Sequence, residues 1–525
     1  MTRPASADAR AARSSVRFSL LLFASAYALL LITHLPLLDL PYYWDEAGYF
    51  IPAARDIYAE GKFVPVSTLS NAHPPLVMAY IAAWWAALGF RIEVARAAMT
   101  GVAALALVGL FRVAERAAGR RVAWATVVCT ALYPVFFAQT TLAHLDMAAA
   151  ALTFWALDFY LPPGDLREGG DEAGGGAGGR RRALSVALFA GAAMAKETAL
   201  LAPFALCGWE VLCGAAGRLK MRAAGKLCLA PRRPVRQTAA LLLAAAPLFA
   251  WLTYHRARTG YFFGNPDYFR YNVESTLTFA RVAEAATTRA WQLTAHMNLW
   301  ALTVPAALLM LLAALRLGAG RAVEDGGVGR RRIDVRVQLV FAVLVSAYAS
   351  ALSVVGGAVL ARYMLPVVPL VILVSVSTIH RRVRRWLLVV AGACVVFAAG
   401  IVVNPPHSFP WEDNLAYRDF VLLHRDAARF IEANHADARV LTAWPATDEL
   451  RNPFYGYTAR PARVVAIEKL SAEHLRRVAA AHYDVALVFS THGGPTLDEA
   501  VAALGAREVR FRAERRGQWV AVVER

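Results

Sequence analysis

The chain has 525 residues, of which 58% are hydrophobic and only 18% are charged. A soluble protein of this length needs more polar surface, so the composition excludes an ordinary soluble fold and predicts an integral membrane protein. The formal net charge is +18, but the basic residues form short clusters between apolar runs. Such clusters are typical of loops beside a membrane, so we expect a lipid bilayer rather than a nucleic acid as partner.

Eleven apolar runs are candidate membrane spans, since a span needs about 20 residues and a short one about 17. The first run has an Arg-containing N-terminus and no small-residue cleavage site soon after it, which indicates a retained span rather than a signal peptide. The candidates are 16–38, 94–112, 122–141, 146–161, 183–195, 198–216, 237–254, 297–317, 338–358, 364–379 and 386–403.

The segment 74–90 is also apolar, but it opens with two prolines and has only 17 residues. If it does not cross, the basic clusters all fall on the side of the N-terminus, and the positive-inside rule makes that side cytoplasmic. If it crossed, nearly every basic cluster would face outward. We therefore predict eleven spans, a first external loop at 39–93, and an interfacial helix at 74–90. The basic clusters lie at 112–121, 162–182, 218–236, 316–336 and 380–385.

The composition changes after Val403. Residues 404–525 contain short strand patterns separated by helix-like stretches at 470–482 and 496–505, and the last two strands read as a hairpin. We predict a transmembrane domain at 1–403 and a small α/β domain at 404–525, which the span count places outside the cytoplasm. The predicted strands are 439–443, 463–467, 484–490, 508–513 and 518–523.

The five cysteines lie in or beside apolar segments and lack the spacing of a metal site or a disulfide framework. The sequence therefore supports neither a zinc site nor a disulfide, and no cofactor is certain. A divalent metal beside Asp45 and Glu46 stays an open alternative, although no ligand set is specified.

Acids and bases that are distant in sequence share the outer face in this topology. Charges at a membrane boundary are costly and usually sit in a polar cavity. Bases there can hold a phosphate, and an acid can take a proton from a nucleophile. Their convergence suits an anionic, lipid-linked substrate. The residues are Asp45, Glu46, His73, His144, Asp146, Lys196, Glu197, Arg362 and Tyr363.

Each of these residues also has a purely structural interpretation. Asp45 and Glu46 could start a surface helix, because acids suit a helix N-terminus. Asp146 and His73 could cap the helices that follow them. Lys196 with Glu197 could form a snorkelling turn, and Arg362 could anchor a span at the interface. The sequence leaves these alternatives open.

The same stretches resemble the dolichyl-phosphate-mannose protein mannosyltransferase superfamily, to which the aminoarabinose transferase of lipid A is related. The resemblance rests on a first span followed by DE, AEGKFVP and PPL, and covers about ten spans. It continues in order through LAHLDMAAAALTFWAL at 142–157, AMAKETALLAPFAL at 193–206 and ARYMLPVVPL at 361–370. It implies a GT-C fold and an inverting glycosyltransferase that uses a polyprenyl-phosphate sugar.

The resemblance also implies roles for single residues. Asp45 matches the general base, Glu46 its companion and Asp146 a second active-site acid. Lys196, Arg362 and Tyr363 match positions near the donor phosphate. The residue before the two prolines is often Lys in relatives but is His73 here, so a phosphate contact at His73 is in doubt.

We therefore expect a bacterial inner-membrane enzyme with a cytoplasmic N-terminus and an extracytoplasmic C-terminal domain. It would transfer a sugar to a hydroxyl group of an envelope lipid such as lipopolysaccharide, a glycan or a protein. Two alternatives are a flippase or transporter of a lipid-linked substrate and a non-catalytic envelope assembly protein. A transporter should show internal repeats or broken helices at mid-membrane, and the sequence shows little of either.

Overall fold

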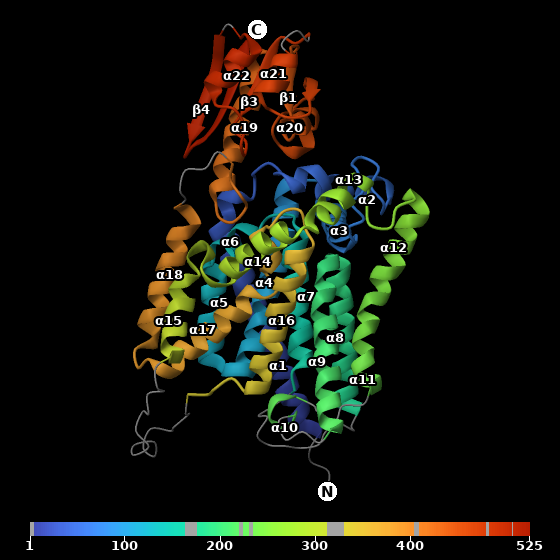
Figure 1. Ribbon diagram of the computed structural model, residues 1–525, viewed down its shortest axis with the longest axis vertical. Coiled ribbons are helices and arrows are strands. Elements are labelled where there is room, and N and C mark those ends of the chain that lie inside the picture. The colour runs from blue at the N-terminus through green and yellow to red at the C-terminus, as the bar shows by residue number, and fades with distance from the viewer. Residues whose placement is uncertain are drawn as a thin grey trace.

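The structure is a computed structural model that describes residues 5–162, 176–219, 224–229, 235–311, 330–403, 409–478, 482–506 and 508–524. It consists of a long helical bundle with a small sheet-containing domain at one end (Figure 1). Most of the predicted basic loops 162–182 and 316–336 lie outside the described residues.

Every predicted span contains a helix. Ala and Leu, which are common in these segments, favour helices. Among the described helices, α15 contains an interior proline, Pro305. The helices of the bundle are α1 (Ala5–His34), α4 (Ile92–Ala118), α5 (Arg120–Leu132), α6 (Pro134–Gln139), α7 (Leu145–Tyr160), α8 (Gly176–Ala195), α9 (Leu201–Arg218), α10 (Ala224–Leu227), α11 (Val235–Ala239), α12 (Ala246–Thr259), α15 (Trp300–Leu311), α16 (Val335–Val354), α17 (Val368–Arg382) and α18 (Trp386–Val402).

Five helices among the described residues are long and apolar enough to cross a membrane. The count becomes six if α14 (Phe279–Thr294) with its short extension to Asn298 forms one broken span with α15, from which it is bent by 109°. Of the other predicted spans, the one in α8 belongs to a helix of 20 residues with three Arg in its first half, and the rest lie in helices of at most 17 residues, so the number eleven stays a prediction. Large apolar side chains on the outside of the bundle, such as Leu21 on α1 and Leu388 on α18, are more than 60% exposed. Such surfaces suit lipid, and the chain is a membrane protein.

Short helices cover the end of the bundle that faces the C-terminal domain (Figure 1). The predicted interfacial segment 74–90 forms α3 (Leu76–Leu88), an apolar helix of 13 residues. It packs beside α2 (Ile51–Glu60) in the first external loop. A second group contains α13 (Pro266–Asn272) and the amphipathic α14.

The C-terminal domain confirms the five predicted strands. They form one sheet in the order β2-β1-β3-β5-β4, in which β1 pairs parallel with β2 and β3, and β5 pairs antiparallel with β3 and β4. The strands are β1 (Arg439–Ala443), β2 (Arg463–Ile467), β3 (Val485–Phe489), β4 (Glu508–Arg515) and β5 (Gln518–Glu524). The helices are α19 (Ala416–Asn434), α20 (Ala446–Arg451), α21 (Ala472–Val478) and α22 (Leu497–Leu504). The sequence analysis did not predict α19, which covers β4 and β5.

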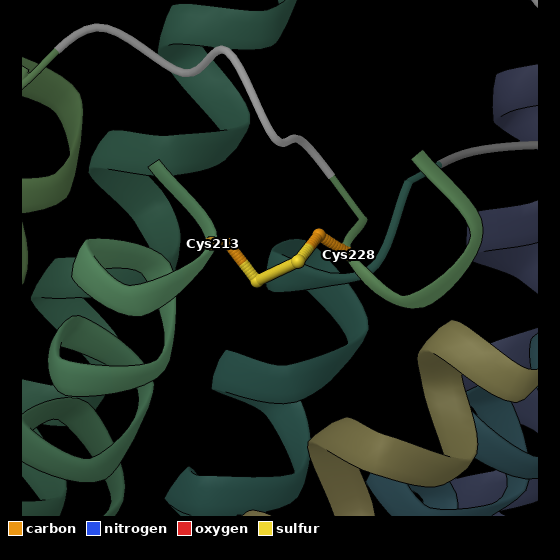
Figure 2. The surroundings of a disulfide bond; sticks show 2 residues. All are labelled: Cys213 and Cys228. Atoms are coloured by element: carbon orange, nitrogen blue, oxygen red, sulfur yellow. A yellow bond between two sulfur atoms is a disulfide. The ribbon is translucent and has the colours of Figure 1, made fainter. Parts of the chain in front are cut away.

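The expectation that no disulfide is present is wrong for this structure. Cys213, near the end of α9, is bonded to Cys228 just after α10, as Figure 2 shows. The two residues are 15 positions apart and lack a motif spacing, so no local pattern marks them as a pair. The bond lies at the end of the bundle away from the C-terminal domain (Figure 1).

Candidate functional site

A cavity of about 1840 Å³ lies at the junction between the bundle and the C-terminal domain. Its walls come from the first external loop, the start of α7, the 3₁₀ turn η4 (Glu197–Leu200), the α13–α14 region, the segment before α17, and the described part of the segment between α18 and α19. Six of the seven predicted site residues line it, namely Asp45, His73, Asp146, Lys196, Arg362 and Tyr363. Helix and turn ends thus bring to one place side chains that are up to 318 positions apart in sequence.

Asp45 is held by an aromatic clamp from the C-terminal part of the chain. Its neighbour Trp44 has a left-handed backbone, with φ of 47°. The Trp44 ring lies 4.6 Å from Phe409 and 4.3 Å from Trp444, measured between ring centroids. These contacts compensate for the unfavourable backbone conformation and fix the direction in which Asp45 points.

Arg362 is the centre of the charged cluster. Its guanidinium lies in the 3₁₀ turn Ala361–Met364 and forms ion pairs with three carboxylates from three different segments. The partners are Asp45, Asp146 at 3.5 Å and Glu412 at 3.0 Å. Its side chain is only 3% exposed, so several hydrogen-bonded carboxylates are needed to offset the loss of hydration.

Two further cations share the ring of Tyr363 with Arg362. Lys196 lies 3.7 Å from the ring centroid, and Arg289 on α14 lies 5.6 Å from it. Lys196 also donates a hydrogen bond to Asp146 Oδ1 at 2.6 Å. Arg289 is fully buried, and its Nε and Nη2 atoms have no hydrogen-bond partner in the described part of the chain. A buried guanidinium with free donors favours an anion nearby.

Glu46 is not brought into the cavity. Its side chain is fully buried and accepts hydrogen bonds from Arg96 Nη2 at 3.0 Å and from the backbone N–H groups of Tyr43 and Ala143. Since these donors saturate the carboxylate, the geometry opposes the expectation that Glu46 is catalytic. It anchors the turn that presents Asp45.

His73 lines the cavity but its ring nitrogens are engaged. Nδ1 lies 3.2 Å from Glu197 Oε2, and Nε2 lies 3.4 Å from the hydroxyl of Tyr268. Glu197 therefore pairs with His73, whereas Lys196 pairs with Asp146. This arrangement makes His73 a wall residue with a weaker case for phosphate contact than Lys196.

Sequence reasoning missed Glu412 and Arg289 as members of the cluster. Glu412 lies on the linker and its side chain is 6% exposed. Burial raises the pKa of its carboxyl to about 7, an effect that Arg362 opposes and Asp45 reinforces. Burial, followed by the charges of Arg362 and Lys196, holds the pKa of His144 well below its usual value, so this ring stays neutral.

The described residues contain no group of three or more His, Cys, Asp or Glu side chains that could hold a metal ion. Three carboxylates of the cavity, those of Asp45, Asp146 and Glu412, are instead paired with Arg362, and that of Asp146 also with Lys196. The cluster therefore fits an anion better than a divalent cation.

No protein-family model matches the chain, and no curated protein matches its sequence. Among solved structures, it is similar to ArnT from Cupriavidus metallidurans bound to undecaprenyl phosphate, with 14% identity and a TM-score of 0.54 over 96% of this chain and 97% of that chain. The apo state of ArnT gives 16% identity and a TM-score of 0.52 over 97% and 98%.

A weaker likeness exists to the archaeal oligosaccharyltransferase AglB from Archaeoglobus fulgidus, in complex with an inhibitory peptide and a dolichol-phosphate. It has 11% identity and a TM-score of 0.45 over 90% of this chain and 69% of that chain, and adds nothing to the fold assignment. ArnT is a lipid A aminoarabinose transferase with the GT-C fold. The likeness to ArnT over both full lengths shows that this chain has the GT-C fold.

Proposed function

We propose that the protein is a glycosyltransferase that moves a sugar from a polyprenyl-phosphate donor to an acceptor hydroxyl. The observation that carries this proposal is the arrangement of three cations around the Tyr363 ring. Lys196, Arg362 and Tyr363 line the cavity together with Asp45, and Arg289 lies 5.6 Å from the same ring. Three cations around one ring form a receptor for a phosphate group. The donor class agrees with the ligand in the ArnT structure, undecaprenyl phosphate.

The exposure of the carboxylates selects the general base. The Asp45 side chain is 22% exposed, whereas those of Asp146 and Glu46 are 5% and 0% exposed. Asp45 is thus the acid of this group that a substrate can reach. It would take the proton of the acceptor hydroxyl as the new bond forms, which contributes about 10²–10⁴-fold to the rate in typical enzymes.

The cations would stabilise the departing phosphate. As the acceptor oxygen attacks the anomeric carbon, the bond to the phosphate oxygen breaks and its charge develops beside Lys196 and Arg362. Phosphate is a good leaving group, so no carboxylic acid is needed to protonate it. A single displacement from the side opposite the phosphate inverts the anomeric carbon.

Apolar residues explain why the donor would be a lipid. The lining of the cavity includes the apolar residues Leu248 and Leu252 on α12 and Leu352 on α16, which are helices of the bundle. An isoprenoid chain could pass such residues into the bilayer while its phosphate stays at Lys196. The positive-inside rule supports a cavity that opens on the extracytoplasmic side, with the C-terminal domain on that side and the N-terminus in the cytoplasm.

The test compares purified wild type with Asp45→Asn and Arg362→Ala. Labelled polyprenyl-phosphate sugars are supplied as donors, and envelope lipids, glycans and proteins from a strain that lacks the protein are supplied as acceptors. Glu468→Gln, whose side chain is 83% exposed in the C-terminal domain, is the matched carboxylate control. We expect transfer by wild type and the control, and none by the two site variants.

Two results would count against the proposal. Wild-type transfer by both site variants would contradict the assignment of the site. Absence of transfer by wild type with every donor, together with lipid translocation in proteoliposomes, would favour the transporter alternative.

A further inference from the structure

Glu412 enters the cavity from a part of the chain that carries none of the predicted site residues. It lies on the linker between α18 and α19, which joins the bundle to the C-terminal domain (Figure 1). Its Oε1 atom accepts a hydrogen bond from Arg362 Nη1 at 3.0 Å. Gln139 Nε2 donates to the Glu412 carbonyl at 3.0 Å, and the Tyr43 hydroxyl donates to the Pro410 carbonyl at 2.9 Å. These hydrogen bonds hold Pro410 and Glu412 in place, so the Glu412–Arg362 pair is built into the fold.

This pair occupies the group that the proposed donor needs. An Arg binds a phosphate through N–H donors in the plane of its guanidinium. In this structure Glu412 and Asp45 accept from the two terminal nitrogens of Arg362. Because Asp146 Oδ2 also lies 3.5 Å from Nε, a donor phosphate that binds in the plane of this guanidinium competes with one of these carboxylates.

The charges of the cluster already balance without a donor. Asp45, Asp146 and Glu412 are three carboxylates, and Arg362, Lys196 and Arg289 are three cations. The donor phosphate, a diester between the sugar and the polyprenyl chain, adds one negative charge to this buried site, and undecaprenyl phosphate, a monoester, adds at least one. Burying that charge is costly unless one carboxylate is neutralised at the same time.

Glu412 is the carboxylate that can become neutral at least cost. Asp45 must stay ionised to act as the proposed base, and Asp146 also accepts from Lys196. The Glu412 carboxylate, by contrast, pairs with Arg362. Burial raises the pKa of Glu412 to about 7, and of the facing groups Arg362 opposes the rise while Asp45 and Asp413 add to it. Of the nearby imidazoles, His144 is neutral and His296 is bonded to Asp413.

We propose that Glu412 is a positioning residue that competes with the donor phosphate for Arg362, so that donor binding is coupled to uptake of one proton by Glu412. This inference rests on the proposed function. The proton comes from solvent, the neutral carboxyl group leaves Arg362 Nη1, and a phosphate oxygen takes its place. No bond other than these hydrogen bonds and the O–H bond of Glu412 changes.

The coupling gives a defined pH dependence. Below about pH 7 Glu412 is protonated and offers no competition, and as the pH rises through about 7 the ionised form becomes dominant. If only the protonated form binds the donor, the apparent affinity equals the intrinsic affinity multiplied by the protonated fraction of Glu412. The apparent affinity is then about tenfold lower at about pH 8 and nearly unchanged at about pH 6. Glu412→Gln keeps the shape of the side chain and removes the charge, so it should remove this loss.

The experiment measures the affinity of the full-length protein in nanodiscs for undecaprenyl phosphate at about pH 6, 7 and 8. Wild type, Glu412→Gln and the exposed control Glu468→Gln are compared, so that the titration of the lipid phosphate itself cancels. We expect Glu412→Gln to bind about tenfold more tightly than wild type at about pH 8 and equally at about pH 6. The control should follow wild type at every pH.

Different failures point to different errors. Equal affinities of wild type and Glu412→Gln at all three pH values overturn this inference alone. Absence of saturable binding by wild type at every pH overturns the proposed donor as well. If Glu412→Gln does not give a monodisperse protein, Glu412→Ala replaces it, and the same pH-dependent gain is required because the alanine also removes the charge.

Discussion

Two short stretches of this chain have nearly the same composition and different tasks. Trp44-Asp45-Glu46 follows the first span, and Trp411-Glu412-Asp413 follows the last helix of the bundle. In both, the first acid contacts Arg362 and the second turns away, Glu46 to Arg96 and Asp413 to His296. The difference lies in access, because the Asp45 side chain is 22% exposed and that of Glu412 only 6%. An acid that contacts solvent can meet a substrate, whereas a buried one can act only through its partner.

The largest effect that tests this comparison is expected at Asp45. Asp45→Asn removes the proposed base, so the initial rate of sugar transfer should fall by about 10²–10⁴-fold. The affinity for undecaprenyl phosphate should not fall, because Lys196, Arg362 and Arg289 remain. A loss of lipid binding equal to the loss of rate would show that Asp45 acts in binding and not in proton transfer.

Glu46→Gln should damage the fold rather than the chemistry. The substitution leaves the guanidinium of Arg96, which is 1% exposed, without a charged partner, and breaking a buried pair costs about 3–5 kcal/mol. Thermal unfolding followed by tryptophan fluorescence should show a clear decrease of the midpoint. The fraction that stays folded should still bind undecaprenyl phosphate. An unchanged midpoint with lost transfer would instead return Glu46 to the catalytic group.

Arg289 sharpens the comparison because it contacts neither acidic stretch. Arg289→Gln removes a buried guanidinium that has two unpaired nitrogens, so binding of undecaprenyl phosphate should weaken by about 1.5–3 kcal/mol, the range of a hydrogen bond to a charged group. Isothermal titration of wild type and variant measures this difference. Affinity within twofold of wild type would show that the phosphate does not reach α14.

The smallest effect is expected at the opposite end of the bundle. The disulfide of Cys213 and Cys228 lies beside α10, at the end of the bundle away from the C-terminal domain (Figure 1), and the proposed orientation places this end in the cytoplasm, where thiols are kept reduced. We therefore expect this bond to be open in cells, so that cells lysed in a membrane-permeant maleimide yield protein with both cysteines alkylated, and Cys228→Ser should transfer sugar at the wild-type rate. Cysteines that resist alkylation until a reductant is added would place this end outside the cytoplasm and reverse the proposed orientation.

Local patterns predicted much of this molecule. Each apolar run that was predicted as a span contains a helix of the bundle, and alternating apolar residues bounded by turn residues located all five strands. Charge asymmetry along the chain predicted one face of the membrane for all seven candidate residues, and six of them line one cavity. These features depend on the periodicity of apolar residues and on the length of apolar sequence that a bilayer requires, and both are visible in neighbouring positions of the sequence.

What was missed depends on pairs that are distant in sequence. Glu46 is buried because Arg96 on α4 meets it, and no local signal marks that pair. Glu412 carried a usable signal, since its Trp-Glu-Asp stretch repeats the pattern of Trp44-Asp45-Glu46. Arg289 carried no such signal, because what distinguishes it is that its Nε and Nη2 atoms have no hydrogen-bond partner among the described residues. The disulfide likewise lacks a sequence motif that would mark Cys213 and Cys228 as a pair.

The clamp on Trp44 has a consequence for how the protein is made. Phe409 and Trp444, which hold Trp44, are synthesised more than 360 residues after it. A nascent chain that has inserted all its spans therefore has the cations of the cavity in place but lacks the surface that orders its first loop. Under the proposed function, competence for transfer should arise only when the C-terminal domain has folded, so an incomplete chain in the bilayer should not consume lipid-linked sugar.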